Sequence, residues 1–164
     1  MKTVAVIFGG RSSEYDVSLS SASGVLANIN TEKYNVIRVG ITREGAFYLF
    51  EDDNALIAKN EWMNGKVCPL SLDLTNGCFS AERETGIEKI KVDVVLPVIH
   101  GKYCEDGTMQ GLLELAGIPY VGCNTYASAV SMDKVFTKLV LNNYGIPQAE
   151  FLHFTDTEIT ANSD

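Results

Sequence analysis

The stretch Val94–Val121, VVLPVIHGKYCEDGTMQGLLELAGIPYV, predicts a strand, a polar loop, a helix and a second strand in succession. Its apolar run Val94–Ile99 is short and rich in β-branched residues, which is typical of a strand buried on both faces. Apolar residues then recur at helical spacing, at Met109, Leu112, Leu113 and Ala116. We expect Asp106 to cap this helix, Gly117 to end it and Ile118–Val121 to form the next strand. Such a unit is typical of α/β proteins.

The polar loop inside this stretch is the first place where we expect a functional site. In parallel sheets, ligands bind beyond the carboxyl ends of the strands, and this loop follows such an end. It contains His100, Gly101, Glu105, Asp106 and Gly107. A lone histidine here is more often structural than catalytic. The two acids are better explained as loop-fixing and helix-capping residues than as acid–base catalysts.

The N-terminal part of the chain predicts a second strand–helix–strand unit. Thr3–Phe8 is an apolar, β-branched run that ends at the turn Gly9-Gly10. The helix that follows has apolar residues at helical spacing, namely Val17, Ala22, Val25, Leu26 and Ile29. Val36–Ile41 is the next predicted strand, and it turns back into a short hairpin with Phe47–Phe50. In a parallel sheet, this unit should cross over right-handed.

The remaining segments are less regular. Between residues 51 and 91, we expect a helix at Asn54–Met63, a strand at Val67–Leu72 and a hairpin turn at Asn76-Gly77, all decorating the sheet edge. Nearer the C-terminus, Asp133–Tyr144 predicts a capped amphipathic helix. Gln148–Phe154 predicts the start of a strand, and the polar tail after it follows no pattern.

Length, charge and cysteine content narrow the class of protein. The 164 residues are enough for one domain, or for one domain and the start of another. A net charge of −8 argues against nucleic acid or an anionic membrane as partner. No apolar run is long enough to cross a bilayer, and MKTVAVIFGG lacks a cleavage site, so we expect a cytoplasmic protein. The four cysteines form no C-x-x-C pair, and we expect neither a metal site nor a disulfide framework.

The loop after the first predicted strand has a glycine turn but no nucleotide fingerprint. Gly9 and Gly10 allow close approach of a ligand to the backbone, and the helix behind them begins with unpaired N–H groups. GGRSSE is not G-x-G-x-x-G, and no G-x-x-x-x-G-K-[ST] is present. Taken alone, Glu14 in this loop is explained as a solvated acid at a helix start. Lys134 lies in the first turn of a predicted helix, where its positive charge is unfavourable with the helix dipole. This unfavourable position suggests that the lysine has a functional role.

Three motifs, in this order, resemble those of the D-alanine–D-alanine ligase family. They are FGGRSSEYDVSLSSA at residues 8–22, HGKYCEDGTMQGLLE at 100–114 and SMDK at 131–134. Each alone is a weak signal, but three in order are strong evidence. The resemblance spans nearly the whole chain, but only the front part of such a ligase. Cys104 departs from the family pattern, which usually has glycine there, so we expect a different backbone path at this position.

The resemblance implies an α/β fold: a Rossmann-like (pre-ATP-grasp) parallel sheet flanked by helices, with a small β-hairpin decoration. Residues 1–122 would form the N-terminal substrate-binding domain, and residues 123–164 would begin the central ATP-grasp domain. It also implies ATP-dependent formation of a D-Ala-D-X dipeptide for peptidoglycan synthesis, through a D-alanyl phosphate and with Mg²⁺ at the transferring phosphoryl group. The family's metal ligands and nucleotide pocket lie beyond Asp164, so this chain alone is expected to be catalytically incomplete. The second substrate, D-alanine, D-lactate or D-serine, stays open.

The matched motifs also imply site residues. Glu14 falls on the glutamate that holds the ammonium group of the first D-alanine, which makes it the candidate catalytic residue. Val17 and Ser18 would wall the same subsite. His100 would lie near the carboxylate of that D-alanine, where an imidazole can donate a hydrogen bond. Lys134 in S-M-D-K would reach toward the ATP phosphates.

Two other classes remain open. A non-catalytic binding or dimerisation module of Rossmann-like fold would suit a short chain, and family members commonly form homodimers through this domain. An unrelated Rossmann-like enzyme would require three ordered motif matches to be accidental. We expect a homodimer, because the apolar faces of residues 17–29 and of the central unit exceed what one small sheet can cover.

Overall fold

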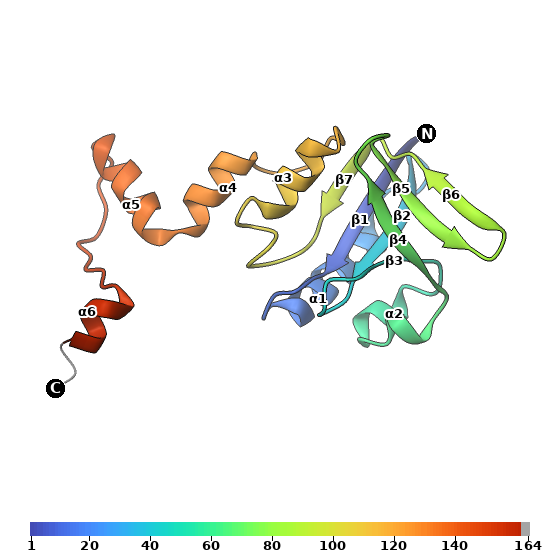
Figure 1. The fold of residues 1–164 in the computed structure, drawn as a ribbon, viewed down its shortest axis with the longest axis horizontal. Coiled ribbons are helices and arrows are strands. Elements are labelled where there is room, and N and C mark those ends of the chain that lie inside the picture. Colours follow the sequence, from blue (N-terminus) through green and yellow to red (C-terminus); the bar gives the residue numbers. More distant parts are fainter. Residues whose placement is uncertain (162–164) are drawn as a thin grey trace.

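A seven-stranded mixed sheet organises the protein, in the order β6-β5-β4-β3-β2-β1-β7 (Figure 1). The computed structural model describes residues 1–161. The strands are β1 (Lys2–Gly9), β2 (Tyr34–Ile41), β3 (Phe47–Phe50), β4 (Val67–Asp73), β5 (Cys78–Arg83), β6 (Gly86–Ile90) and β7 (Val94–Pro97). The helices are α1 (Tyr15–Asn28), α2 (Ala55–Ala58), the 3-10 turn η1 (Trp62–Asn64), α3 (Thr108–Leu115), α4 (Thr125–Met132), α5 (Lys134–Asn143) and α6 (Asp156–Ala161). The predicted α/β class is confirmed.

Only part of the sheet is parallel. The strand β1 lies between β2 and β7 and runs parallel to both, as expected from the two strand–helix patterns. The strands β3, β4, β5 and β6 are added antiparallel beyond β2. The predicted decoration is therefore larger than one hairpin, and β6 was missed because GIEKI is almost wholly exposed. An exposed strand lacks the alternating burial pattern that marks a strand in sequence.

The two faces of the sheet are covered by different elements. Along β1, successive side chains point to opposite faces, so that Ala5 and Ile7 enter one core and Val6 and Phe8 the other. The first core is covered by α3, and the second by α1 and by Trp62 of η1. The indole N–H of Trp62 donates to the Tyr15 hydroxyl at 2.8 Å, which joins η1 to the start of α1.

Several predicted boundaries differ from those in the structure. The strand predicted at Val94–Ile99 ends at Pro97, and Ile118–Val121 pairs with β7 only through the single bridge between Val95 and Tyr120. The N-cap of α3 is Gly107, although the Asp106 carboxylate accepts from Thr108 N–H at 3.0 Å. The helix predicted at Asn54–Met63 is broken into α2 and η1.

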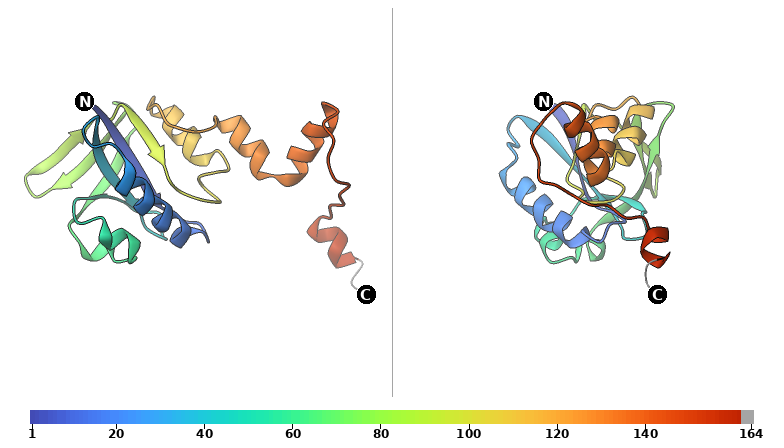
Figure 2. Two further views of the ribbon diagram at one scale, coloured as in Figure 1. Left: turned by 180° about the vertical axis from the view of Figure 1, so that it is seen from behind. Right: turned by 90° about the vertical axis from the view of Figure 1, so that its left-hand side faces the viewer.

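The last three helices form an arm that extends away from the sheet (Figures 1 and 2). Asp133 caps α5 as predicted, accepting from Val135 N–H at 2.9 Å and Phe136 N–H at 3.0 Å. The apolar face expected on α5 exists in the sequence, but no residue of α5 is buried. The predicted strand at residues 148–154 does not form, because no strand among residues 1–161 lies beside it to pair with. The tail beyond Ala161 lies outside the described residues.

Within residues 1–161, no helix has the length and apolarity that a membrane span would require.

The Ser18 hydroxyl is the most deeply buried polar group near the parallel strands. Its side chain is fully buried, and its oxygen accepts from Gly9 N–H at 2.8 Å while donating to the Val98 carbonyl. A buried N–H left without a partner costs about 1–3 kcal/mol. We therefore expect Ser18→Ala to lower the free energy of unfolding by about that amount, measured by urea denaturation followed by circular dichroism.

Ser20→Ala is the matched control, because Ser20 is exposed on the same helix. Its free energy of unfolding should change by less than about 0.5 kcal/mol. Equal losses of unfolding free energy in the two variants would show that the hydrogen bonds of the Ser18 hydroxyl do not stabilise the fold.

Candidate functional site

Two loops meet beyond the carboxyl ends of the parallel strands. One follows β1 and leads into α1, and the other follows β7 and leads into α3. Ser18 of α1 bonds to the backbone of both, at Gly9 and at Val98. Gly10 N–H also donates to the Ile41 carbonyl at 2.9 Å, which fixes the first loop to the end of β2. The loops predicted to carry the site are therefore side by side.

Three of the predicted site residues converge at this junction. One ligand atom from each of Glu14, His100 and Glu105 lies within 4.8 Å of the other two. The His100 Nδ1 atom is 3.9 Å from Glu105 Oε1, and the His100 Nε2 atom is 3.0 Å from the Ser21 hydroxyl. Glu14 and Glu105 are exposed and His100 is half-buried, so the cluster is open to a ligand. We call Glu14, His100 and Glu105 the carboxylate–imidazole cluster.

Gly101 allows the Glu14 carboxylate to approach the second loop. Its φ is +71°, and a Cβ built there would lie 2.6 Å from the Ser12 hydroxyl and 2.8 Å from Glu14 Oε1. Any side chain at this position would therefore displace the carboxylate. The Gly101 N–H donates to Glu105 Oε2 at 2.8 Å, so that one short segment positions both acids.

Asp106 fixes the loop, as the sequence predicts. Its carboxylate accepts from Tyr103 N–H at 2.8 Å as well as from Thr108 N–H. Burial opposes ionisation of Asp106, but these hydrogen bonds outweigh it and lower the pKa of the carboxyl below its ordinary value. Further along the motif, Glu114 accepts from the Tyr120 and Thr125 hydroxyls, which ties α3 to the start of α4.

Cys104 is part of the core and not of the cluster. Its side chain is 3% exposed and packs in the same core as Met109 and Leu113. Burial, together with the charges of Glu105 and Asp106, raises the pKa of the thiol to about 11, against a hydrogen bond from the backbone of Ile99 that lowers it. Besides glycines, the left-handed residue of this loop is Tyr103, with φ of +68°, so Cys104 itself needs no conformation that glycine favours.

The other predicted site residues lie apart from the cluster or beneath it. Ser18 is fully buried and supports the loops, while Val17 is 50% exposed on α1. Lys134 is exposed at the start of α5, where its ammonium group donates to the Ser131 carbonyl at 3.2 Å. In both lengthwise views α5 lies away from α1, so the structure does not bring Lys134 to the cluster (Figures 1 and 2).

Two serines of the site were not singled out from the sequence. The Ser12 hydroxyl accepts from Glu14 N–H at 3.0 Å, and Ser21 holds the imidazole of His100. Both belong to the motif FGGRSSEYDVSLSSA, which is the signal that could have identified them. Ser21 is separated from His100 by 79 positions, so its partner is evident only in the fold.

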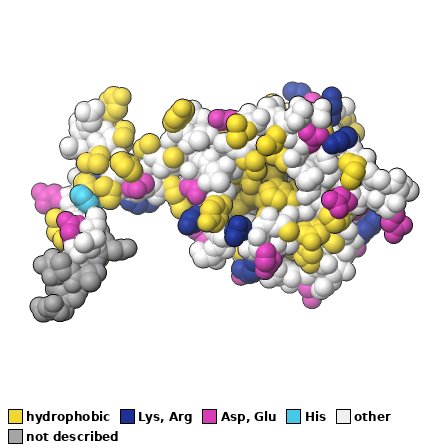
Figure 3. Space-filling view, in the orientation of Figure 1, with side chains coloured by type: hydrophobic (Ala, Val, Ile, Leu, Met, Phe, Trp, Pro, Cys, Tyr) yellow, Lys and Arg dark blue, Asp and Glu magenta, His cyan; other side chains and the backbone are white. Residues whose placement is uncertain are grey.

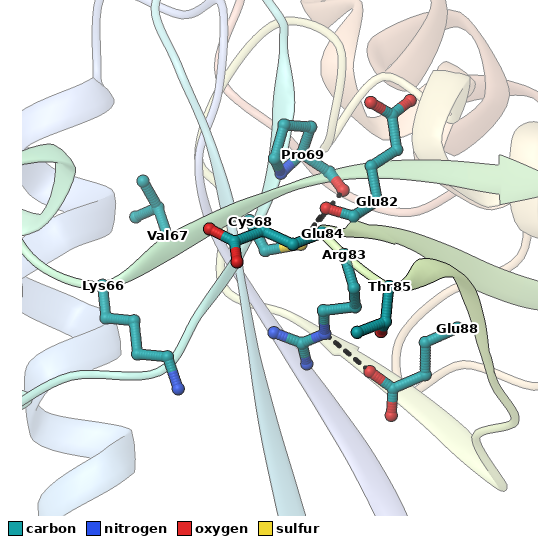
Figure 4. A pocket seen from close by; sticks show the side chains of 9 residues that line it. All are labelled: Lys66, Val67, Cys68, Pro69, Glu82, Arg83, Glu84, Thr85 and Glu88. Atoms are coloured by element: carbon teal, nitrogen blue, oxygen red, sulfur yellow. Dashed lines mark hydrogen bonds and ion pairs between the residues drawn. The ribbon is translucent and has the colours of Figure 1, made fainter.

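An open cavity of about 630 Å³ lies on the antiparallel part of the sheet (Figure 4). It is lined by residues 66–69, 82–85 and 88, none of which belongs to the two loops. Its central cation, Arg83, is bound to Glu88 at 2.7 Å and to Glu51 at 2.6 Å. Because Glu51 and Glu88 already neutralise that charge, we explain this cavity as a structural feature of the β4–β6 region.

Comparison with known proteins relates both loops to one family. The family model described as D-ala D-ala ligase N-terminus matches residues 3–123. A D-alanine–D-alanine ligase of Acetivibrio thermocellus is 44% identical over 96% of this chain and 46% of its own length. The chain thus spans about half the length of the curated relatives it matches.

Solved structures show the same likeness. The VanG D-Ala:D-Ser ligase from Enterococcus faecalis superposes with a TM-score of 0.85 at 42% identity, over 99% of this chain and 49% of that one. A D-alanine–D-alanine ligase from Bacillus anthracis, solved in complex with ATP, gives a TM-score of 0.63 at 29% identity, over 96% of this chain and 42% of its own.

Proposed function

Because this chain belongs to the D-alanine–D-alanine ligase family, we propose that it is the first-substrate half of an ATP-dependent D-alanine ligase. The observation that carries this proposal is the carboxylate–imidazole cluster, built from residues of two matched motifs. In the complete enzyme, the carboxylate of a first D-alanine is phosphorylated by ATP, and a second substrate attacks the acyl phosphate to give a D-Ala-D-X dipeptide. We place this activity in the cytoplasm, in the supply of peptidoglycan precursors.

The cluster suits the zwitterionic head of a small amino acid. The ammonium group of D-alanine is its only cationic group, and Glu14 offers it a carboxylate beside Gly101. Charge-assisted hydrogen bonds of this kind are about twice as strong as neutral ones. Since the Nε2 atom of His100 is held by Ser21, we assign Nδ1 as the ring nitrogen that faces the substrate.

Val17 and Ser18 have different roles in this proposal. Val17 is half-exposed on the first turn of α1 and can contact the substrate methyl group or a neighbouring wall. Both hydrogen bonds of the buried Ser18 hydroxyl go to the backbone, so we assign to Ser18 the positioning of the two loops.

The described residues of this chain, 1–161, do not fit Mg²⁺. This ion takes oxygen ligands in octahedral geometry, but the one group of His, Cys, Asp and Glu side chains found close enough in residues 1–161 to share an ion includes an imidazole. One Glu105 oxygen in that group is already bound to the Gly101 N–H. We therefore assign Mg²⁺ and most of the ATP site to the half of the ligase that this chain does not span. Lys134 would contact the ATP phosphates once the arm packs on that half.

The arm supports a domain boundary near residue 122. The family model ends at residue 123, and α4 begins at Thr125. Beyond this point the described residues are largely exposed, including the apolar side chains of α5. We propose that residues 1–122 form the substrate-binding domain and that residues 123–164 begin the ATP-grasp domain.

In the complete ligase, we expect Glu14→Gln to weaken apparent affinity for the first D-alanine by about tenfold to a hundredfold, because a charge-assisted bond of roughly 1.5–3 kcal/mol is lost. Affinity for ATP should stay nearly unchanged. Steady-state kinetics at varied D-alanine and varied ATP measures both. Glu32→Gln, an exposed acid near the start of β2, is the control. A first-site affinity within twofold of the parent would reduce Glu14 to a helix-start acid.

We expect the 164-residue chain alone neither to hydrolyse ATP nor to form a dipeptide. Its described residues supply a wall for the first substrate but no set of oxygen ligands for Mg²⁺. A phosphate-release assay with ATP, Mg²⁺ and D-alanine tests this expectation. Release that survives rigorous purification and disappears in Glu14→Gln would contradict it.

We also propose a homodimer with two-fold symmetry, although the apolar face expected to be uncovered at residues 17–29 is largely packed on the sheet, with Leu19, Ala22 and Leu26 buried. Large apolar side chains are exposed on α3, α4 and the loop between them, namely Leu115, Val121, Tyr126, Val130 and Met132. Exposed apolar side chains in such numbers are typical of an interface. Sedimentation equilibrium should show a dimer at micromolar concentration, and a monomer at high micromolar concentration would contradict the proposal.

A further inference from the structure

A second cavity lies beside the carboxylate–imidazole cluster but shares none of its three residues. It has a volume of about 150 Å³, and its floor is formed by Ile41, Phe47, Ile99, Met109 and Leu112. These side chains belong to the core covered by α3, at the end where β1, β2 and β7 finish. Figure 3 shows an apolar hollow on this face, with Lys or Arg side chains beside it. The hollow is therefore built by the ordered core of the protein.

Two unpaired cations border this cavity. Arg11 and Lys102 both line it, and within the part of the chain that the structure describes neither takes part in an ion pair. Among the 13 Lys and Arg side chains, Arg43, Lys66, Arg83 and Lys89 are each bound to an acid, whereas within residues 1–161 the charges of Arg11 and Lys102 are free beside the cavity. Two free positive charges beside an apolar floor are complementary to a ligand with an apolar body and an anionic head.

The cations are held at the rim by defined contacts. The guanidinium of Arg11 lies 5.8 Å from the centre of the Tyr103 ring, and the ammonium of Lys102 lies 5.1 Å from the same centre. The stem of Arg11 passes so close to Gly45 that a Cβ there would be 2.6 Å from Arg11 Cδ. Both charges are thus positioned over one aromatic ring before any ligand binds, which lowers the entropy cost of binding.

The volume limits the size of the apolar body. A cavity of about 150 Å³ lined by aliphatic and aromatic side chains is known to admit benzene in another protein. A planar guanidinium binds a carboxylate through two parallel hydrogen bonds. A more strongly hydrated anion, such as free phosphate, would gain nothing from the apolar floor.

We propose that this cavity is a binding site for an aromatic monocarboxylate of the size of benzoate. The ring enters between Phe47, Ile99 and Met109, and the carboxylate meets Arg11 and Lys102. The site is separate from the one proposed for D-alanine, whose methyl group is too small to fill the floor and whose ammonium group Arg11 and Lys102 would repel.

Titration of the ¹⁵N-labelled chain with sodium benzoate tests the proposal. Two comparison ligands separate its parts: benzamide keeps the ring without the charge, and acetate keeps the charge without the ring. We expect benzoate to perturb the amides of residues 10–11, 41–47 and 99–112. Both comparison ligands should bind at least about tenfold more weakly, because each loses one half of the contact. Binding of benzamide or acetate as tight as that of benzoate would overturn the proposal, as would perturbation centred elsewhere or no perturbation up to the solubility of benzoate.

Matched variants of the cations locate the site. Arg11→Gln and Lys102→Gln should each weaken benzoate binding by about tenfold, because each removes a charge-assisted hydrogen bond. Lys33→Gln, an exposed lysine after α1, should bind within twofold of the parent. The amide spectrum of each variant without ligand shows that it is folded. Folded Arg11→Gln and Lys102→Gln variants that bind benzoate as tightly as the parent would contradict the assignment.

Discussion

One hydroxyl group holds the functional end of this fold together. Ser18 is buried without access to water and bonds to the backbone at the ends of two parallel strands, β1 and β7. Burying a polar group is costly unless its hydrogen bonds are satisfied, and here both are. The same contact that stabilises the junction therefore also sets the spacing of the loops that carry Glu14 and His100.

The chemistry of the site depends as much on a missing side chain as on those present. Gly101 places backbone where a Cβ would collide with Glu14, and its N–H holds Glu105. Two carboxylates and an imidazole thereby lie close together, although Glu14 and His100 are far apart in the sequence. The neighbouring acid, Asp106, accepts hydrogen bonds from the backbone of its own loop instead.

The sequence alone predicted those structural features that depend on a local residue pattern or on a motif. The strands β1, β2, β3 and β4 were found from their apolar runs, and the cap at Asp133 from its residue type. Features that depend on contacts between residues far apart in the sequence were not predicted. The exposed strand β6 has no periodicity to reveal it, and residues 148–154 have a strand-like composition but no neighbouring strand among the described residues. The contact between Ser21 and His100 likewise required the fold.

The helix α1 connects these contacts mechanically. Glu14 stands at its N-cap, Ser18 follows four residues later and Ser21 three residues after that, so all three lie on one face. On that face, Glu14 provides the carboxylate, Ser18 bonds to the ends of β1 and β7, and Ser21 bonds to the imidazole of His100. A rotation or slide of α1 would therefore move all three together as one rigid body. The position of α1 over the sheet thus sets the Glu14 carboxylate, the contact between the two loops and the support of His100 at the same time.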